Sequence, residues 1–188
     1  MDIKILSKGN WPVLQVDNFY DQDEQDDIWA EIHRYHQEGK WERSDQDHDV
    51  SAITDDGKRV VRRGARNGGE ILSKNSRVYL RPPSPILKHH KKMYSPLVME
   101  VYRRIAPYTR TIVDIEQDSS FLSYYDDGDK YGFHTDNSTH SALVYFHEEP
   151  KQFTGGDLQF EDSGLTVECK HNRMLLFPSF YMHGSTEV

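Results

Sequence analysis

The apolar and polar positions along the chain predict helices in its first part and strands in its second. Residues 13–16 form a short apolar run typical of a strand. A helix is predicted from about residue 21 to residue 38, where Asp21 and Glu24 have the spacing of a capping box. The inner stripe of this helix is expected to consist of Ile28, Ile32 and Tyr35.

A second helical region is predicted after residue 83. Ser84 provides a cap and Pro85 a first helical position, and the pair Ser95 and Pro96 restarts or kinks the helix. The buried face of this region is expected to consist of Leu97, Val98, Val101, Tyr102 and Ile105.

Residues 42–76, between these two regions, contain few apolar anchors. The segment is acidic first (WERSDQDHD), then basic (GKRVVRRGAR) and then rich in glycine (NGGE). Segments of this length without regular structure inside a compact domain are usually functional lids or disordered. We therefore predict a mobile lid over about residues 42–76.

From residue 111 the pattern changes to short apolar runs separated by turn formers such as DDGDK and EEPKQFTGG. The predicted strands are TIVDIEQ, SFLSYY, HSALVYF, DLQFED, LTVECK and RMLLFPS. In LTVECK, Leu165, Val167 and Cys169 alternate with polar residues, so Cys169 is expected to be a small core residue. Many short antiparallel strands favour a sandwich or jelly roll, and the expected class is α+β, mainly β.

Length and composition favour one domain over residues 1–188, helix-rich to about 110 and strand-rich over 111–188. The net charge of −8 argues against broad binding to a phosphate backbone, so a nucleic-acid partner is not expected. The single cysteine excludes an internal disulfide framework, and the sequence shows no signal peptide or apolar run of membrane-spanning length. We expect a cytoplasmic protein without a membrane partner; its oligomeric state does not follow from the sequence.

The candidate chemistry lies in YGFHTDNSTHS and at the end of RMLLFPSFYMHG. Alternate residues of a strand share a face, so His134 and Asp136 can point inward together, and His183 can join them from another strand. Two further His-x-acid triples, HQE on the predicted helix and HEE in a polar turn, are expected at the surface. Two imidazoles and one carboxylate on one face of an iron ion leave the opposite positions open, as in non-haem Fe(II) oxygenases.

Four segments, in this order, resemble successive strands of Fe(II)- and 2-oxoglutarate-dependent dioxygenases, particularly the prolyl 4-hydroxylase-like branch. They are SYYDDGDKYGFHTD, ALVYFHEE, FTGGDLQFED and NRMLLFPSFYMHGSTEV, within residues 121–188. The resemblance implies a double-stranded β-helix (jelly roll) core with supporting N-terminal and central helices. It also implies Fe(II) as the metal, 2-oxoglutarate and O2 as co-substrates, and ascorbate as a reductant.

The same resemblance assigns roles to individual residues. The iron ligands of the family match His134, Asp136 and His183. Tyr124 and Tyr145 match family tyrosines near the co-substrate, and Tyr131 matches one nearer the substrate. The alternative for each tyrosine is a half-buried ring with its hydroxyl in water. The glycine turn of the family matches Gly155 and Gly156, where a conformational role is expected.

One departure concerns the distal carboxylate of 2-oxoglutarate. The family holds this group with an Arg or Lys slightly downstream of the last histidine, whereas only GSTEV follows His183 here. We favour a further C-terminal strand beyond the sequence given, because STEV stops where a strand should continue. The alternative is a basic residue elsewhere, such as Lys151 or Arg173.

These features predict a 2-oxoglutarate-dependent oxygenase that hydroxylates an unactivated C–H bond, with a prolyl residue of a peptide or protein as the expected substrate. The carboxylate of Asp136 favours hydroxylation over halogenation, because it fills the position that related halogenases leave for halide. In the predicted lid, Arg62 and Arg66 are candidates to bind an acidic substrate, although they also suit a solvated basic loop. The sequence leaves open a small-molecule or methylated nucleic-acid substrate, a cupin-like metalloprotein that does not use 2-oxoglutarate, and a β-sandwich binding module without catalysis.

Overall fold

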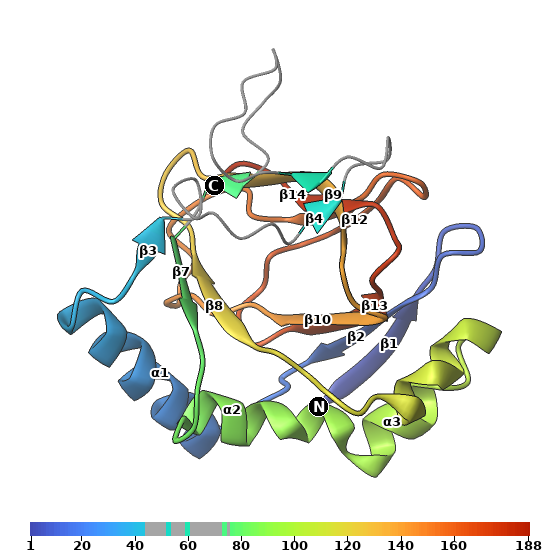
Figure 1. Cartoon of the computed structure of the whole chain (residues 1–188), viewed down its shortest axis with the longest axis horizontal. Helices are drawn as coiled ribbons and strands as arrows, with labels where there is room; N and C mark the ends of the chain where they lie inside the picture. Colours follow the sequence, from blue (N-terminus) through green and yellow to red (C-terminus); the bar gives the residue numbers. More distant parts are fainter. Residues whose placement is uncertain (44–51, 54–58, 61–72, 75) are drawn as a thin grey trace.

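The computed structural model describes residues 1–43, 52–53, 59–60, 73–74 and 76–188. Most of the predicted lid, including Arg62 and Arg66, lies outside these residues. In the described part, a layer of helices lies beneath two facing β-sheets (Figure 1). No helix among the described residues is both long and apolar enough to cross a membrane.

The helices begin where the sequence predicts. They are α1 (Gln22–Gln37), α2 (Pro85–His90) and α3 (Pro96–Tyr102), with 3₁₀ turns at Lys91–Tyr94 and Pro107–Asp114. The capping box of α1 is confirmed: the Asp21 carboxylate accepts from the Glu24 backbone N–H, and the Glu24 carboxylate accepts from that of Asp21. The cap of α2 is confirmed too, because the Ser84 hydroxyl accepts from the Leu87 backbone N–H.

All strand pairs in the described residues are antiparallel. One sheet has the order β1-β2-β13-β10, made of Asp2–Leu6, Val13–Asp17, Met174–Pro178 and His140–Val144. The facing sheet has the order β12-β11-β14-β9-β4-β5, made of Leu165–Val167, Leu158–Phe160, His183–Ser185, Lys130–Asp136, Ala52–Ile53 and Arg59–Val60, and β6 (Ser73–Lys74) also pairs with β9. A smaller sheet has the order β3-β7-β8, made of Glu42–Arg43, Ser76–Tyr79 and Phe121–Tyr124.

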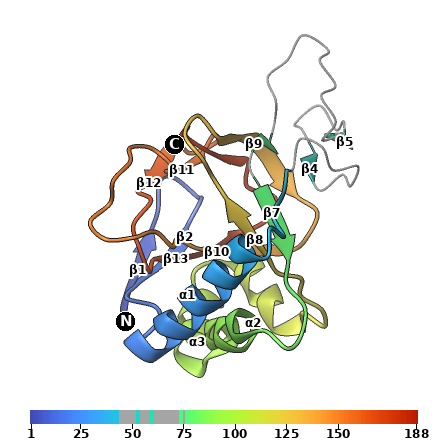
Figure 2. The same cartoon turned by 90° about the vertical axis from the view of Figure 1, so that its left-hand side faces the viewer.

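Strand β13 is buried on both faces, which explains its uninterrupted apolar run. Met174 and Leu176 pack toward the helices, together with Ile28, Val98 and Tyr102. On the opposite face, Leu175 and Phe177 pack between the two sheets with Leu158 and Phe160 of β11. Seen from the side, the helices cover the outer face of the first sheet (Figure 2). The facing sheet, which carries the candidate residues, therefore rests on a rigid two-sided core.

Two predictions are wrong, one about the first strand after residue 111 and one about α3. The run TIVDIEQ was expected to be a strand, but most of it lies in the 3₁₀ segment Pro107–Asp114. Pro107 starts this segment. The Thr109 hydroxyl stabilises its first turn, because it accepts a hydrogen bond from the Ala106 N–H and donates one to the Ala106 carbonyl. Thr109 and Ile112, three apart, are the buried residues of this segment. Leu97 was expected in the core but is 54% exposed, because the face of α3 that packs inward carries Val98 and Tyr102.

Candidate metal centre

The structure brings the three predicted ligand residues together. Strand β9 carries His134 and Asp136, and β14, paired with β9, carries His183 directly opposite His134. One potential ligand atom from each residue lies within 4.8 Å of the others. The Asp136 carboxylate lies between the imidazoles, 3.4 Å from Nε2 of His134 and 3.5 Å from Nε2 of His183. These separations suit one ion bound by all three side chains at about 2 Å.

Both imidazoles are oriented by the backbone. Nδ1 of His134 lies 2.8 Å from the Gly132 carbonyl, and Nδ1 of His183 lies 2.7 Å from the Tyr181 carbonyl. A carbonyl only accepts, so each Nδ1 carries the proton and each Nε2 presents its lone pair toward Asp136. This tautomer is the one that a metal at the centre of the three residues requires.

Asp136 is supported by hydroxyl groups that the sequence analysis did not single out. Ser141 donates a hydrogen bond to Oδ2 of Asp136, and the Ser141 hydroxyl lies 2.7 Å from that of Ser179. The Asp136 backbone N–H donates to the Ser179 carbonyl at 3.1 Å. The sequence could have indicated Ser141, because it is a polar residue on the same face of HSALVYF as the inward-pointing Leu143 and Tyr145.

Burial and charge set the protonation states of the centre. Desolvation lowers the pKa of the buried His134, although its hydrogen bond with Asp136 opposes the shift. Burial by itself would raise the pKa of Asp136, but the hydrogen bonds and charges of His134 and His183 outweigh it and hold the pKa well below its usual range. A neutral imidazole beside an ionised carboxylate is the state that binds a divalent cation.

A bulge places Tyr131 next to the metal ligands. His183 of β14 pairs with His134 of β9, and Ser185 pairs with Tyr131. These pairs are two residues apart on β14 but three apart on β9, so β9 contains one extra residue between them. Tyr131 and His134 would otherwise point to opposite faces; instead their rings stack with centroids 3.8 Å apart. The structure thus places Tyr131 beside the centre, and its role toward a substrate stays a prediction.

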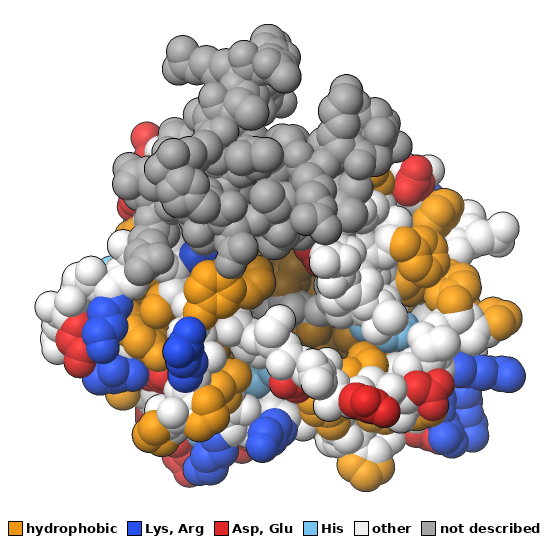
Figure 3. All heavy atoms as spheres, viewed as in Figure 1, with side chains coloured by type: hydrophobic (Ala, Val, Ile, Leu, Met, Phe, Trp, Pro, Cys, Tyr) orange, Lys and Arg blue, Asp and Glu red, His pale blue; other side chains and the backbone are white. Residues whose placement is uncertain are grey.

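The residues of the centre open into a large cavity between the sheets, about 2030 Å³ in volume. Its described lining includes all three predicted tyrosines, Tyr124, Tyr131 and Tyr145. In Figure 3 the surface is hollowed near the middle of this face, and hydrophobic side chains show at the bottom of the hollow. A small co-substrate alone fills less than this volume, so there is room for part of a larger substrate.

The predicted co-substrate tyrosines lie in different parts of this cavity. Tyr145 projects between the sheets, and burial raises the pKa of its hydroxyl well above the ordinary value. Tyr124 is 38% exposed and packs edge-on against His36, near the end of α1, with Trp41 beside it. Both roles stay predictions, and the position of Tyr145 suits a small buried ligand better.

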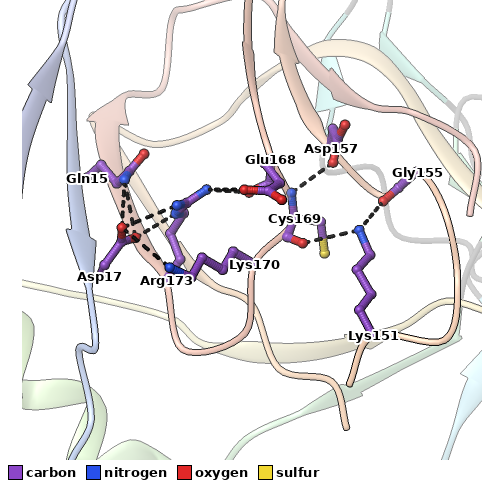
Figure 4. Close-up of polar contacts among 9 residues, drawn as sticks. All are labelled: Gln15, Asp17, Lys151, Gly155, Asp157, Glu168, Cys169, Lys170 and Arg173. Atoms are coloured by element: carbon purple, nitrogen blue, oxygen red, sulfur yellow. Dashed lines mark hydrogen bonds and ion pairs between the residues drawn. The ribbon is translucent and has the colours of Figure 1, made fainter. Parts of the chain in front are cut away.

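The two basic residues considered for the distal carboxylate have different surroundings (Figure 4). Arg173 is buried and paired with Asp17, with Nε 2.6 Å from Oδ1, and it is not part of the cavity lining. Lys151 does line the cavity, where its ammonium donates to the carbonyls of Gly155 and Cys169 at 3.0 and 3.2 Å. The structure therefore excludes Arg173 from this role, because its guanidinium is engaged elsewhere.

Comparisons with known proteins agree with this geometry. Residues 120–188, which hold all three candidate ligands, match the sequence model of the 2OG-Fe(II) oxygenase superfamily. None of the curated proteins compared with the sequence matches it. The resemblance stated from the four strand segments is thereby confirmed.

Solved structures extend the likeness to the whole fold. A Pseudomonas putida prolyl-4-hydroxylase has a TM-score of 0.62 at 16% identity, over 94% of this chain and 86% of that one. The viral collagen prolyl hydroxylase of Paramecium bursaria Chlorella virus-1, in complex with 2OG, has a TM-score of 0.59 at 12% identity, over 94% and 88%. A Trichoplax adhaerens prolyl hydroxylase in complex with a hypoxia inducible factor peptide fragment has a TM-score of 0.62 at 15% identity, over 93% and 77%. The chain thus has the fold of prolyl hydroxylases, with supporting helices and a strand-rich second part as the sequence predicts.

Proposed function

We propose that the chain is an Fe(II)- and 2-oxoglutarate-dependent dioxygenase that hydroxylates an unactivated C–H bond. The convergence of His134, Asp136 and His183 carries the proposal, because both imidazoles present Nε2 to a shared point beside the carboxylate. The matched superfamily uses this metal and this co-substrate. We also propose that the two facing sheets form the double-stranded β-helix that the resemblance implies.

Each residue has a definite task in this scheme. Nε2 of His134, Nε2 of His183 and an Asp136 oxygen would hold Fe(II) from one side and leave the other side to ligands. When bound, the iron supplies oxygen activation coupled to decarboxylation of 2-oxoglutarate to succinate, with ascorbate as an auxiliary reductant. Tyr124 and Tyr145 are proposed to contact the co-substrate. The apolar side chains around Tyr145 would limit access of water to the co-substrate.

A prolyl residue of a peptide or protein is the substrate that we propose. The shared fold with prolyl hydroxylases supports it, as does a cavity larger than the co-substrate needs. Tyr131, stacked on His134, would form the wall against which the target residue rests. Arg62 and Arg66, which lie outside the described residues, remain candidates for contact with an acidic substrate.

Anaerobic spectroscopy tests the metal and co-substrate assignment. Fe(II) and 2-oxoglutarate added together should give a metal-to-ligand charge-transfer band, which Asp136→Ala should abolish and the exposed Asp23→Ala should leave intact. Absence of the band in iron-loaded protein would overturn the assignment and favour a cupin-like protein. Mass spectrometry of proline-containing peptides, small molecules and methylated oligonucleotides after aerobic incubation should show the gain of one oxygen on a prolyl residue, with stoichiometric succinate.

A further inference from the structure

Arg77 is a buried cation in the wall of the metal cavity. It lies on β7, the middle strand of the smallest sheet, and only 4% of its surface is exposed. No carboxylate whose side chain the structure describes forms an ion pair with it. A buried charge is stable only when it is paired or hydrogen-bonded, so Arg77 is suited to contact with an anion.

The guanidinium contacts two aromatic rings, one of which stacks on a metal ligand. Its Cζ atom lies 4.6 Å from the ring centroid of Phe121 and 5.0 Å from that of Tyr131. Tyr131 stacks in turn on His134, with centroids 3.8 Å apart and an interplanar angle of 24°. Contact with an aromatic ring does not use the N–H donors of a guanidinium.

The guanidinium carries an unsatisfied donor. Nε of Arg77 is buried and has no hydrogen-bond partner among the residues that the structure describes, and Arg77 is part of the cavity lining together with Tyr131 and His134. A buried N–H without a partner is unfavourable, and a ligand in the cavity can supply the missing acceptor. Nε–H and the adjacent Nη–H form a fork that matches the two oxygens of a carboxylate.

We propose that Arg77 binds a carboxylate of the substrate, next to the position that is hydroxylated. The proposal rests on the proposed oxygenase function and adds the chemical class of substrate that the site selects. The other possible source of a carboxylate is the distal end of 2-oxoglutarate. Arg77 contacts Tyr131, the residue proposed to form the wall of the substrate site, and Tyr131 in turn stacks on His134. We therefore favour a carboxylate of a peptide that lies along the Tyr131 ring.

Peptide binding tests the proposal without turnover. The probes are two proline-centred peptides that differ only in carrying Glu or Gln on both sides of the proline, titrated calorimetrically into the anaerobic Fe(II) and 2-oxoglutarate complex. The wild-type protein should bind the Glu peptide at least 10-fold more tightly, and Arg77→Gln should remove this difference. Arg77→Lys should retain part of it, because the charge remains and the fork is lost. Arg104→Gln, at an exposed arginine, should change nothing.

Titration of two 2-oxo acids separates the two sources of the carboxylate. 2-Oxopentanoate has a methyl group where 2-oxoglutarate has its distal carboxylate. If Arg77→Gln weakens 2-oxoglutarate binding but not 2-oxopentanoate binding, Arg77 holds the co-substrate and the substrate proposal is overturned. Equal binding of both peptides by the wild-type protein, or no binding of either, also overturns it. Loss of the charge-transfer band in the wild-type protein would instead refute the proposed function itself.

Discussion

His134 and His183 lie directly opposite each other on antiparallel strands, with ring centroids 4.4 Å apart. Their relative position therefore depends on the pairing of β9 with β14. A slip of one residue in this pairing would turn one imidazole to the opposite face of the sheet. The candidate centre is consequently as rigid as the contact between these two strands.

Gly184→Ala should weaken iron binding by disturbing that contact. Gly184 lies between His183 and Ser185, and a Cβ atom there would stand 2.8 Å from the Tyr131 carbonyl oxygen and 3.0 Å from the Gly132 carbonyl carbon. The strands must move apart to accept it, which shifts His183 relative to His134. We expect Fe(II) affinity to fall at least about 10-fold, as measured by anaerobic titration.

Gly39→Ala is the control for this prediction. Gly39 follows α1 with a φ of +61°, so alanine there should cost roughly 1 kcal/mol of stability without affecting the metal ligands. Wild-type iron affinity in Gly184→Ala would show that the centre does not depend on close packing of β9 and β14.

Ser141→Ala should lower iron affinity through the orientation of Asp136. The Ser141 hydroxyl donates to Oδ2 of Asp136, and without it the carboxylate loses a partner that fixes its rotation. Loss of such supporting hydrogen bonds typically costs 10- to 100-fold in metal affinity or activity. Ser138 bonds to Ser179, one step further from the carboxylate, so Ser138→Ala should have a smaller effect. An equal loss in both variants would contradict a specific role for Ser141.

The features predicted correctly from the sequence depend on local patterns. The Asp21 and Glu24 cap is a contact between residues three apart in the sequence. The apolar residues of RMLLFPS are consecutive, so the run predicts a buried strand without reference to distant segments. The convergence of His183 with His134 and Asp136 was predicted because alternate strand positions share a face and because the family resemblance matched all three residues to iron ligands. TIVDIEQ was misread because its branched residues suggest a strand, while the preceding Pro107 starts a helical turn.

The features missed by the sequence analysis depend on contacts between distant segments. Arg77 meets Phe121 and Tyr131 only after three strands have assembled, and nothing near Arg77 in the sequence indicates this. Tyr131 shares a face with His134 only because of the bulge, which regular alternation along β9 does not predict. Strand β1 was missed because its run, DIKIL, is short and mostly exposed.

Cys169 should react slowly with alkylating agents in the folded protein. Burial raises the pKa of its thiol to about 11, although the nearby Lys151 ammonium acts in the opposite direction. Because the thiolate is the reactive form, alkylation by iodoacetamide at pH 8 should be roughly 100-fold slower than in the urea-unfolded chain. Cys169 is the single cysteine, so one mass shift reports this residue alone. Similar rates in the folded and unfolded protein would contradict its place in the core.

The buried pair of Asp17 and Arg173 should make stability depend on pH. Arg173 donates from Nε to Oδ1 at 2.6 Å and from Nη2 to Oδ2 at 3.2 Å, and this hydrogen bonding holds the pKa of Asp17 below its usual range. A lowered pKa in the folded state gives a stabilisation that is complete above the unfolded value of about 3.9 and is lost as the pH falls through the folded value.

Asp17→Asn should therefore lower the free energy of unfolding by about 3 kcal/mol at pH 7, at the low end for a broken buried pair because Glu168 remains near Arg173. Urea unfolding at pH 7, 5 and 3 should show the difference from wild type shrinking only at the lowest pH, while Glu38→Gln, in the exposed pair with Arg34, should match wild type throughout. A difference that stayed undiminished at pH 3 would mean that the ionisation of Asp17 is not its source.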